Sequence, residues 1–248
     1  MPVEYLRSLT ASERTRQSNV HLGLSLCFIA GAINAGGFLA IGMYTSHMTG
    51  VVSSMADDLV LGKMALVQLG LISLVSFVSG AACSAVMINW ARRRQSRHAY
   101  TMPLLLEAAM LLAFGLVDAL QHGAGGTVVG LTAGLLCFIM GLQNAMITKI
   151  SNAEIRTTHV TGLVTDIGIE LGKLLYWNRA SLGPPVMANR ERLSLHLRLV
   201  GTFFLGGLIG ALGFQHAGYV ATLPLALALA ALSSLQFLPV RATEAAPR

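Results

Sequence analysis

A nine-residue stretch occurs twice in this chain, and the repetition determines how the rest of the sequence is interpreted. Residues 27–35 read CFIAGAINA and residues 137–145 read CFIMGLQNA, with six of the nine positions identical. A second pair follows in the same order: residues 45–50 read TSHMTG and residues 157–162 read TTHVTG, with four of the six positions identical. Two matching pairs in one order indicate an internal duplication.

The similarity weakens toward the end of each copy but continues. Residues 77–80, FVSG, resemble residues 204–207, FLGG. Residues 100–104, YTMPL, resemble residues 221–225, ATLPL. Because these matches keep the order of the first two, the sequence predicts a duplicated unit of three helices.

The composition is typical of a membrane protein. Of the 248 residues, 54% are hydrophobic and 11% are charged, and the mean hydropathy is +0.65. Soluble domains carry about 25% charged residues, so this chain has too few charges to cover a water-facing surface. The net charge of +6 comes from basic residues beside apolar segments, a pattern of membrane proteins, so no nucleic-acid partner is expected.

Six apolar stretches are each long enough to cross a bilayer, and each can satisfy its backbone there only as a helix. They cover residues 21–43, 64–91, 101–120, 127–148, 195–214 and 219–240. The expected fold class is therefore all-α, a polytopic membrane protein with six transmembrane helices.

The basic residues predict how these spans are oriented. Sixteen of the 17 lysines and arginines fall on one side of a six-span arrangement, and Lys63 alone falls on the other. Because basic residues collect on the cytoplasmic side, both termini are expected in the cytoplasm. The sixteen are Arg7, Arg14, Arg16, Arg92, Arg93, Arg94, Arg97, Lys149, Arg156, Lys173, Arg179, Arg190, Arg192, Arg198, Arg241 and Arg248.

An odd number of spans in each copy reverses the direction in which the second copy enters the membrane. The two three-helix repeats are therefore expected to be inverted, related by a pseudo-twofold axis in the membrane plane. The expected parts of the chain are a polar cytoplasmic N-terminus (1–20), a single membrane domain (21–240) made of repeat one (21–121) and repeat two (127–240), a cytoplasmic linker with a short amphipathic helix (174–198), and a cytoplasmic tail (241–248).

A short amphipathic helix is predicted after the TSHMTG and TTHVTG motifs, at residues 50–61 and 162–173. Neither is long enough to span a bilayer, so each is either re-entrant or interfacial, and the sequence leaves both open. Thr49 and Thr161 are expected to act as N-caps, either for capping alone or with contact to a ligand as well.

Several polar residues are candidates for a substrate site or pathway because the duplication pairs them. His47 matches His159, and Asn34 matches Asn144. A buried amide in an apolar helix either holds helices together or contacts a ligand, and both remain open. Asp166, on the polar face of the second short helix, is added to this group.

Two acidic residues lie in the third predicted span. Glu107 and Asp118 are eleven residues apart, which places them on one face of a helix. An ionisable group inside a bilayer is costly and is usually functional. We therefore expect Glu107 to point into the protein, toward a polar cavity, and both acids to be candidates for proton coupling; a structural hydrogen bond is the alternative.

These motifs also carry a resemblance to a known family. Residues 31–34 (GAIN), 48–50 (MTG), 141–145 (GLQNA) and 156–162 (RTTHVTG) resemble the DUF1275, or YoaK-like, family of six-span bacterial membrane proteins. The resemblance extends over residues 22–239 and implies a location in the bacterial cytoplasmic, or inner, membrane. Many members place Asn after the first Thr-Gly, where this chain has Val51. The family has no established activity.

Two functions compete on these grounds. The first is a small-solute transporter or channel with a site between the inverted repeats. The second is a non-transporting scaffold or regulatory protein that acts through residues 174–198. Because neither HExxH nor GxSxG occurs, no enzymatic activity is expected. Because GxxxxGK[ST] is absent too, transport would rely on an ion gradient or a partner.

No cofactor or metal is expected, because the three cysteines are scattered and neither motif histidine has a second ligand at helical spacing. The CxxCH motif of attached haem is also missing. The expected partners are the lipid bilayer and an unknown small solute, with assembly as a homo-oligomer left open.

Overall fold

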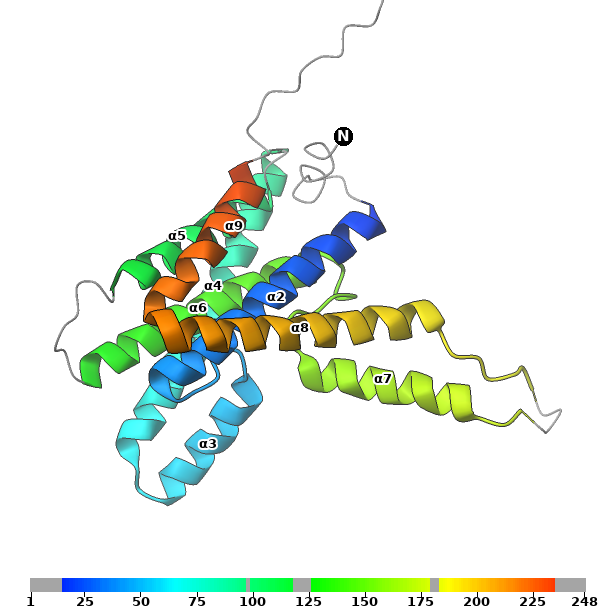
Figure 1. Cartoon of the computed structure of the whole chain (residues 1–248), viewed down its shortest axis with the longest axis horizontal. Helices are drawn as coiled ribbons and strands as arrows, with labels where there is room; N and C mark the ends of the chain where they lie inside the picture. Colours follow the sequence, from blue (N-terminus) through cyan, green and yellow to red (C-terminus); the bar gives the residue numbers. More distant parts are fainter. Residues whose placement is uncertain (1–14, 97–98, 118–125, 179–182, 235–248) are drawn as a thin grey trace, which may run out of the picture.

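The computed structural model describes residues 15–96, 99–117, 126–178 and 183–234, and these residues form helices and connecting turns without strands. In chain order the elements are α2 (Arg16–Ile41), α3 (Met48–Val60), α4 (Met64–Arg93), α5 (Thr101–Val117), α6 (Gly126–Ile150), α7 (Val160–Leu175), α8 (Arg190–Ala217), the 3₁₀ helix η2 (Gly218–Ala221) and α9 (Thr222–Ser234). Figure 1 shows this arrangement.

Four segments of the described chain are long and apolar enough to cross a membrane. They are Arg16–Ile41, Met64–Arg93, Val129–Ile150 and Arg190–Ser234. The last of these contains α8, η2 and α9, and Figure 1 shows that the chain changes direction between α8 and α9. A shorter apolar helix covers Thr101–Leu116. These lengths and compositions are those of a multi-pass membrane protein.

The long helices pack in pairs, and each pair takes one helix from each half of the chain. α2 packs against α8, α4 packs against α6, and α5 packs against α9. Within each half, the short helix packs on the long helix that follows it, α3 on α4 and α7 on α8. In Figure 1, α3 and α7 extend from the central crossing in different directions.

Small residues allow the backbones of the paired helices to approach closely. A Cβ atom on Gly31 of α2 would overlap the carbonyl oxygen of Phe203 on α8, and one on Gly206 would overlap that of Phe28. The α4–α6 pair repeats the arrangement, because Gly80 faces the Phe138 carbonyl and Gly141 faces the Phe77 carbonyl. Glycine is therefore required at all four crossing positions.

These contacts correct the predicted alignment of the repeats by one residue. The sequence match aligned Phe77 with Phe204, whereas the crossing contacts of Phe77 correspond to those of Phe203. Phe204 is 68% exposed and faces outward. The sequence alone allowed either register, because residues 203 and 204 are both Phe. The structure decides for Phe203, because its carbonyl is the one that packs against a glycine of the paired helix.

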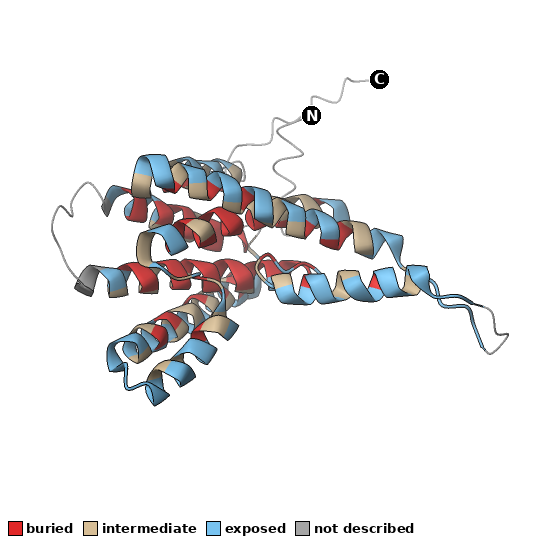
Figure 2. Cartoon of the chain, turned by 60° about the horizontal axis from the view of Figure 1, so that its bottom comes forward, coloured by how far each residue is buried: buried red, intermediate tan, exposed pale blue. Residues whose placement is uncertain are grey.

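The core lies where the helices cross, and the outward faces are exposed, as Figure 2 shows. Many large hydrophobic side chains lie on these exposed faces. Cys27 and Cys137 are both buried at this crossing. The Cys27 sulfur lies 3.2 Å from the carbonyl oxygens of Thr157 and Leu199, which belong to the other half of the chain. The repeated nine-residue stretch thus forms the inner layer of the molecule.

One predicted helix was wrong, and two helices begin earlier than the predicted spans. The short amphipathic helix expected within residues 174–198 is not separate, because α8 begins at Arg190 and is continuous to Ala217. Its N-cap is Asn189, whose side chain accepts a hydrogen bond from the Arg192 N–H, and this cap explains the early start. α2 begins at Arg16, after the N-cap Thr15, so it includes the last residues of the predicted polar N-terminus (1–20).

Candidate functional site: a cavity between the repeated segments

After α2 the chain turns back toward the helix it has just left. Gly42 ends α2 in the left-handed conformation with φ 74°, which favours glycine. Asn34 then holds the following segment, because its Oδ1 accepts hydrogen bonds from the Ser46 N–H at 3.1 Å and the Ser46 hydroxyl at 2.9 Å. The segment from Thr45 to His47 is therefore fixed against the middle of α2, at Asn34, and not at the C-terminal end of that helix.

The second copy makes the equivalent turn after α6. The Asn144 Oδ1 accepts hydrogen bonds from the hydroxyls of Thr158 at 2.8 Å and Thr157 at 3.3 Å. Both asparagines thus position the segment that follows their helix. Holding the fold together was one of the two roles left open for them, and the contact to a ligand stays a prediction.

The two short helices begin next to these turns, but the predicted caps were wrong. His47 and His159 are the N-cap residues of α3 and α7, and neither side chain makes a capping hydrogen bond. Thr49 and Thr161 are the second residues of their helices. A Thr-Gly pair before an apolar run resembles a cap in sequence. In the structure, the hydrogen bonds from Asn34 to Ser46 and from Asn144 to Thr158 fix the preceding turn, so each helix begins before its threonine.

The starts of α3 and α7 meet at one cavity of about 460 Å³, called the central cavity below. Small-molecule sites in proteins measure roughly 300–1,000 Å³. Its lining residues come from α2, α3, α4, α7, α8 and the two turns: Asn34, Tyr44, Ser46, His47, Met48, Thr49, Phe77, Thr158, His159, Val160, Thr161, Gly162 and Phe203.

The lining of the central cavity is polar, and among the described residues it contains no Asp, Glu, Lys or Arg. Phe203 and Phe77, whose carbonyls face Gly31 and Gly141 at the crossings, contribute equivalent apolar walls. Of the predicted site residues, the cavity brings together Asn34, His47, His159, Thr49 and Thr161; Asn144 is not among its lining residues.

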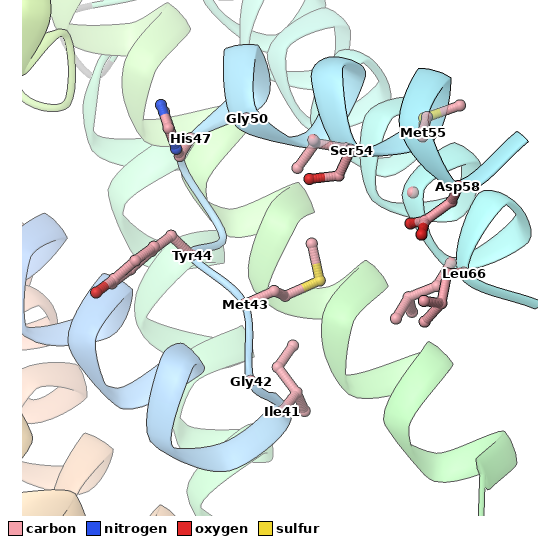
Figure 3. Close-up of a pocket in the computed structure, with 13 residues that line it drawn as sticks. Ile41, Gly42, Met43, Tyr44, His47, Gly50, Ser54, Met55, Asp58 and Leu66 are labelled. Atoms are coloured by element: carbon pink, nitrogen blue, oxygen red, sulfur yellow. The ribbon is translucent and has the colours of Figure 1, made fainter. Parts of the chain in front are cut away.

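A second pocket, of about 330 Å³, lies between α3, the start of α4 and the turn after α2; Figure 3 shows it. We call it the outer pocket, after the predicted orientation. Its lining is largely apolar and includes Met55, Leu66 and Leu69, with Asp58 as the acidic member. Tyr44 and His47 line both this pocket and the central cavity.

A third pocket, of about 520 Å³, lies in the same place relative to α7 and α8, and we call it the inner pocket. It contains Asp166, which therefore lies outside the central cavity in which it was grouped with the motif residues. Arg192 donates to Asp166 Oδ2 at 3.0 Å, and His196 Nδ1 lies 3.9 Å from the same oxygen. Gly162 lines both the inner pocket and the central cavity.

Of the two acidic residues predicted for proton coupling, the structure describes Glu107. Glu107, on α5, is completely buried, so it points into the protein as expected. Neither carboxylate oxygen has a hydrogen-bond partner among the described residues. Glu107 does not line the central cavity, the outer pocket or the inner pocket, so the polar cavity expected beside it is none of these three. Asp118 lies outside the described residues.

Sequence reasoning missed the residues that complete these cavities. Phe77 and Phe203 were treated only as members of a weak repeat match, although a Phe three residues before a Gly in both copies was a usable signal. Arg192 was assigned to the predicted cytoplasmic linker (174–198), and His196 fell both in that linker and in the predicted span (195–214), where neither was considered for a site. No pattern in the sequence marked Tyr44.

The fold and the cavity define a multi-pass membrane protein in which two repeated segments from different halves meet at one cavity. The chain belongs to the family described as "Protein of unknown function (DUF1275)", whose model matches residues 22–235. It is similar to the UPF0700 transmembrane protein YoaK of Bacillus subtilis (strain 168), with 27% identity over 157 residues, covering 62% of this chain and 68% of that protein. No solved structure matches the chain.

Proposed function

We propose that the protein is a small-solute transporter or channel of the bacterial cytoplasmic membrane, with the central cavity as its solute site. In this proposal six helices span the membrane as two inverted three-helix repeats, and both termini are cytoplasmic. The observation that carries it is the meeting of the two repeated segments, one from each half, at a single cavity lined by polar side chains.

The order of the three cavities supports a route through the protein. His47 lines both the outer pocket and the central cavity, and Gly162 lines both the central cavity and the inner pocket. A solute leaving the central cavity would therefore pass His47 on one side and Gly162 on the other. Inverted repeats with a site at their interface are common in secondary transporters, because rocking one half against the other opens the site to each side in turn.

The energy source in this proposal is an ion gradient. Glu107 serves as the proton-coupling acid, because it is a buried carboxyl group for which the described residues provide no partner. Since Glu107 does not line the cavities, coupling would act through the packing of α5 against α9 and α6. Asp118 keeps its predicted role as a second acid on the same helix. No enzymatic step is part of the proposal.

Thiol labelling tests whether the central cavity opens to both sides. Cysteines are placed at positions 47 and 159 in a chain whose Cys27, Cys83 and Cys137 have been replaced by alanine. Membrane-impermeant maleimide is then applied to right-side-out and to inverted vesicles. We expect each cysteine to react in both preparations, because the site is exposed alternately.

Two further variants serve as controls for the labelling. A cysteine at Val60, which is 88% exposed at the end of α3, should react from one side only. A cysteine at Leu104, which is completely buried, should not react at all. If positions 47 and 159 stay unlabelled while position 60 reacts, the core is sealed and the transport proposal is wrong.

A sealed core would favour the alternative function, a scaffold or regulatory protein acting through residues 174–198. The described parts of this segment expose large side chains at the end of α7 and before α8: Leu175 is 85% exposed, Trp177 73% and Met187 78%. Exposed apolar and aromatic side chains fit a protein partner or the interfacial layer of a membrane.

A further inference from the structure

Side chains cap the first turns of α2 and α8 but not those of α3 and α7, which begin at the central cavity. The Thr15 side chain accepts from the Ser18 N–H at the start of α2, and the Asn189 side chain accepts from the Arg192 N–H at the start of α8. His47 and His159 provide no such bond to α3 and α7. α4 also starts without a side-chain cap, after the exposed Lys63, so α3 and α7 are distinguished by starting uncapped at the cavity.

The uncapped starts leave backbone donors available. The first backbone hydrogen bonds run from Val51 N–H to the His47 carbonyl at 3.0 Å and from Leu163 N–H to the His159 carbonyl at 3.1 Å. The N–H groups before them, at residues 48–50 and 160–162, have no partner among the described residues. Such groups carry the positive end of the helix dipole.

Asn34 adds a side-chain donor that is independent of the helix starts. The side chain is 9% exposed and lines the central cavity. A backbone N–H can only donate, so the bond from Ser46 N–H identifies the accepting atom as Oδ1 and leaves Nδ2 free of that contact. Asn34 Nδ2 has no hydrogen-bond partner among the described residues, whereas Asn144 Nδ2 donates to the Met140 carbonyl at 2.9 Å.

The remaining lining of the cavity fits the same kind of ligand. No described carboxylate lines the central cavity, so no acidic side chain among the described residues repels a negative charge or neutralises the donors there. No described Lys or Arg lines it either, so the N–H groups are the donors that would meet an anion. Phe77 and Phe203 provide two apolar walls for an uncharged part of the ligand.

We propose that the central cavity binds a small organic monoanion, a carboxylate with an apolar or aromatic body. The carboxylate accepts hydrogen bonds from Asn34 Nδ2 and from the free N–H groups at the starts of α3 and α7, and the body lies between Phe77 and Phe203. This inference rests on the proposed function in taking the same cavity as the solute site, and it names the solute class.

Binding of benzoate to the full-length protein in lipid nanodiscs tests the proposal by calorimetry at pH 7. Benzamide has the same ring without the charge, and nitrate is an anion without an apolar body. We expect benzoate to bind about tenfold or more tightly than either, because only benzoate uses both the donors and the apolar walls.

Charge variants localise the site. Thr49→Asp and Thr161→Asp each place a carboxylate in the first turn of a short helix, where an acid favours the helix. Each should leave the melting temperature equal or higher while weakening benzoate binding about tenfold or more, because like charges now share the cavity. The matched control is Ser53→Asp, which adds the same charge to α3 at an exposed position outside the described cavities.

The outcomes separate this proposal from the transport proposal. Benzamide binding as tightly as benzoate, or equal weakening by Ser53→Asp and Thr49→Asp, would overturn the anion site. Nitrate binding as tightly as benzoate would overturn the organic body. Benzoate binding together with a sealed core in the thiol experiment would keep the anion site and reject transport, and the reverse pair of results would reject the anion site and keep transport.

Discussion

The outer and inner pockets occupy the same place in the two halves of the molecule, but their chemistry differs. In the outer pocket Ser54, Leu66 and Gly70 lie around α3 and the start of α4. The inner pocket has Asp166, Arg192 and His196 at the corresponding positions of α7 and α8. At these three positions the backbone arrangement is kept, while the side chains change from uncharged to ionisable.

The helix crossing between these pockets has changed much less. Gly31 and Gly141, like Gly80 and Gly206, face carbonyl oxygens of the paired helix in both halves. A backbone crossing tolerates no larger residue, so it stays the same in both copies. The pockets are not limited in this way, and the inner one carries the charges expected of the cytoplasmic side. Arg16 adds to them by pairing with Glu154 at 2.8 Å and Glu191 at 3.0 Å.

The largest effect is expected from a side chain at the crossing. Gly31→Val and Gly141→Val should each destabilise the folded state by about 3 kcal/mol or more, because the added carbons meet backbone that cannot move aside. The yield of monodisperse protein in size-exclusion chromatography measures the loss. Equal losses in the two halves would support an equivalent crossing.

Gly172→Ala is the matched control for the crossing variants. Nothing lies within 4 Å of a Cβ atom at Gly172 in α7, so the alanine should leave the yield unchanged or raise it. If Gly31→Val behaves like Gly172→Ala while Gly141→Val does not, the two crossings are not equivalent and the comparison fails.

The acid of α5 provides a functional difference between the halves, because the matching helix α9 contains no acidic residue. Glu107→Gln should abolish the pH dependence of solute movement into proteoliposomes while leaving the protein folded, since glutamine has nearly the same shape and cannot release a proton. Thr101→Val, another buried polar position of α5, is the control and should keep the pH dependence. An unchanged pH profile in the Gln variant would remove the coupling role.

A smaller effect on stability is expected beside the inner pocket, where Glu170 of α7 is hydrogen-bonded to the N-cap residue of α8. Glu170 accepts from the Lys173 ammonium at 2.8 Å and from the Asn189 N–H at 2.7 Å. Glu170→Gln should lower the thermal unfolding midpoint by a few degrees. Asp58, the repeat counterpart in α3, has no side-chain bond among the described residues, so Asp58→Asn should change the midpoint less. Equal shifts would contradict the assigned difference between the halves.

The same carboxylate predicts how the stability depends on pH. The hydrogen bond from Lys173, followed by the one from Asn189, holds the pKa of the Glu170 carboxyl below its usual value of 4.5. Its contribution is therefore fully present above about pH 4.5 and is lost as the pH falls through the lower pKa of the folded state. Thermal unfolding measured between pH 7 and 3 should fall less steeply for Glu170→Gln; parallel curves would refute this.

The smallest effect is expected from the exposed ion pair in the inner pocket. The Arg192 and Asp166 side chains are 52% and 34% exposed, and such pairs contribute about 0–1 kcal/mol. Asp166→Asn should therefore leave the unfolding midpoint nearly unchanged. A shift larger than that of Glu170→Gln would mean that Asp166 also holds His196, and the inner pocket would then be a structural cluster.

Local sequence was sufficient to predict the elements that depend on neighbouring residues. Hydrophobic length predicted the apolar helices, and the repeated motifs identified Asn34 with Asn144 and His47 with His159 as equivalent pairs. It was wrong about the N-caps, because capping depends on where a turn begins. Here the hydrogen bonds of Ser46 and Thr158 to asparagines more than ten residues earlier decide this.

The amino-acid sequence by itself determined the membrane character of the chain, the duplication and the short helices after each motif, since composition, repetition and periodicity are properties of the chain. Only the tertiary structure decided which helices pair, that Phe77 corresponds to Phe203, and that Asp166 faces Arg192 instead of the central cavity. The physical reason is that these contacts join residues from different helices. Their distances depend on how closely two helix backbones approach each other. The glycines permit a close approach, but they do not specify which helix is the partner.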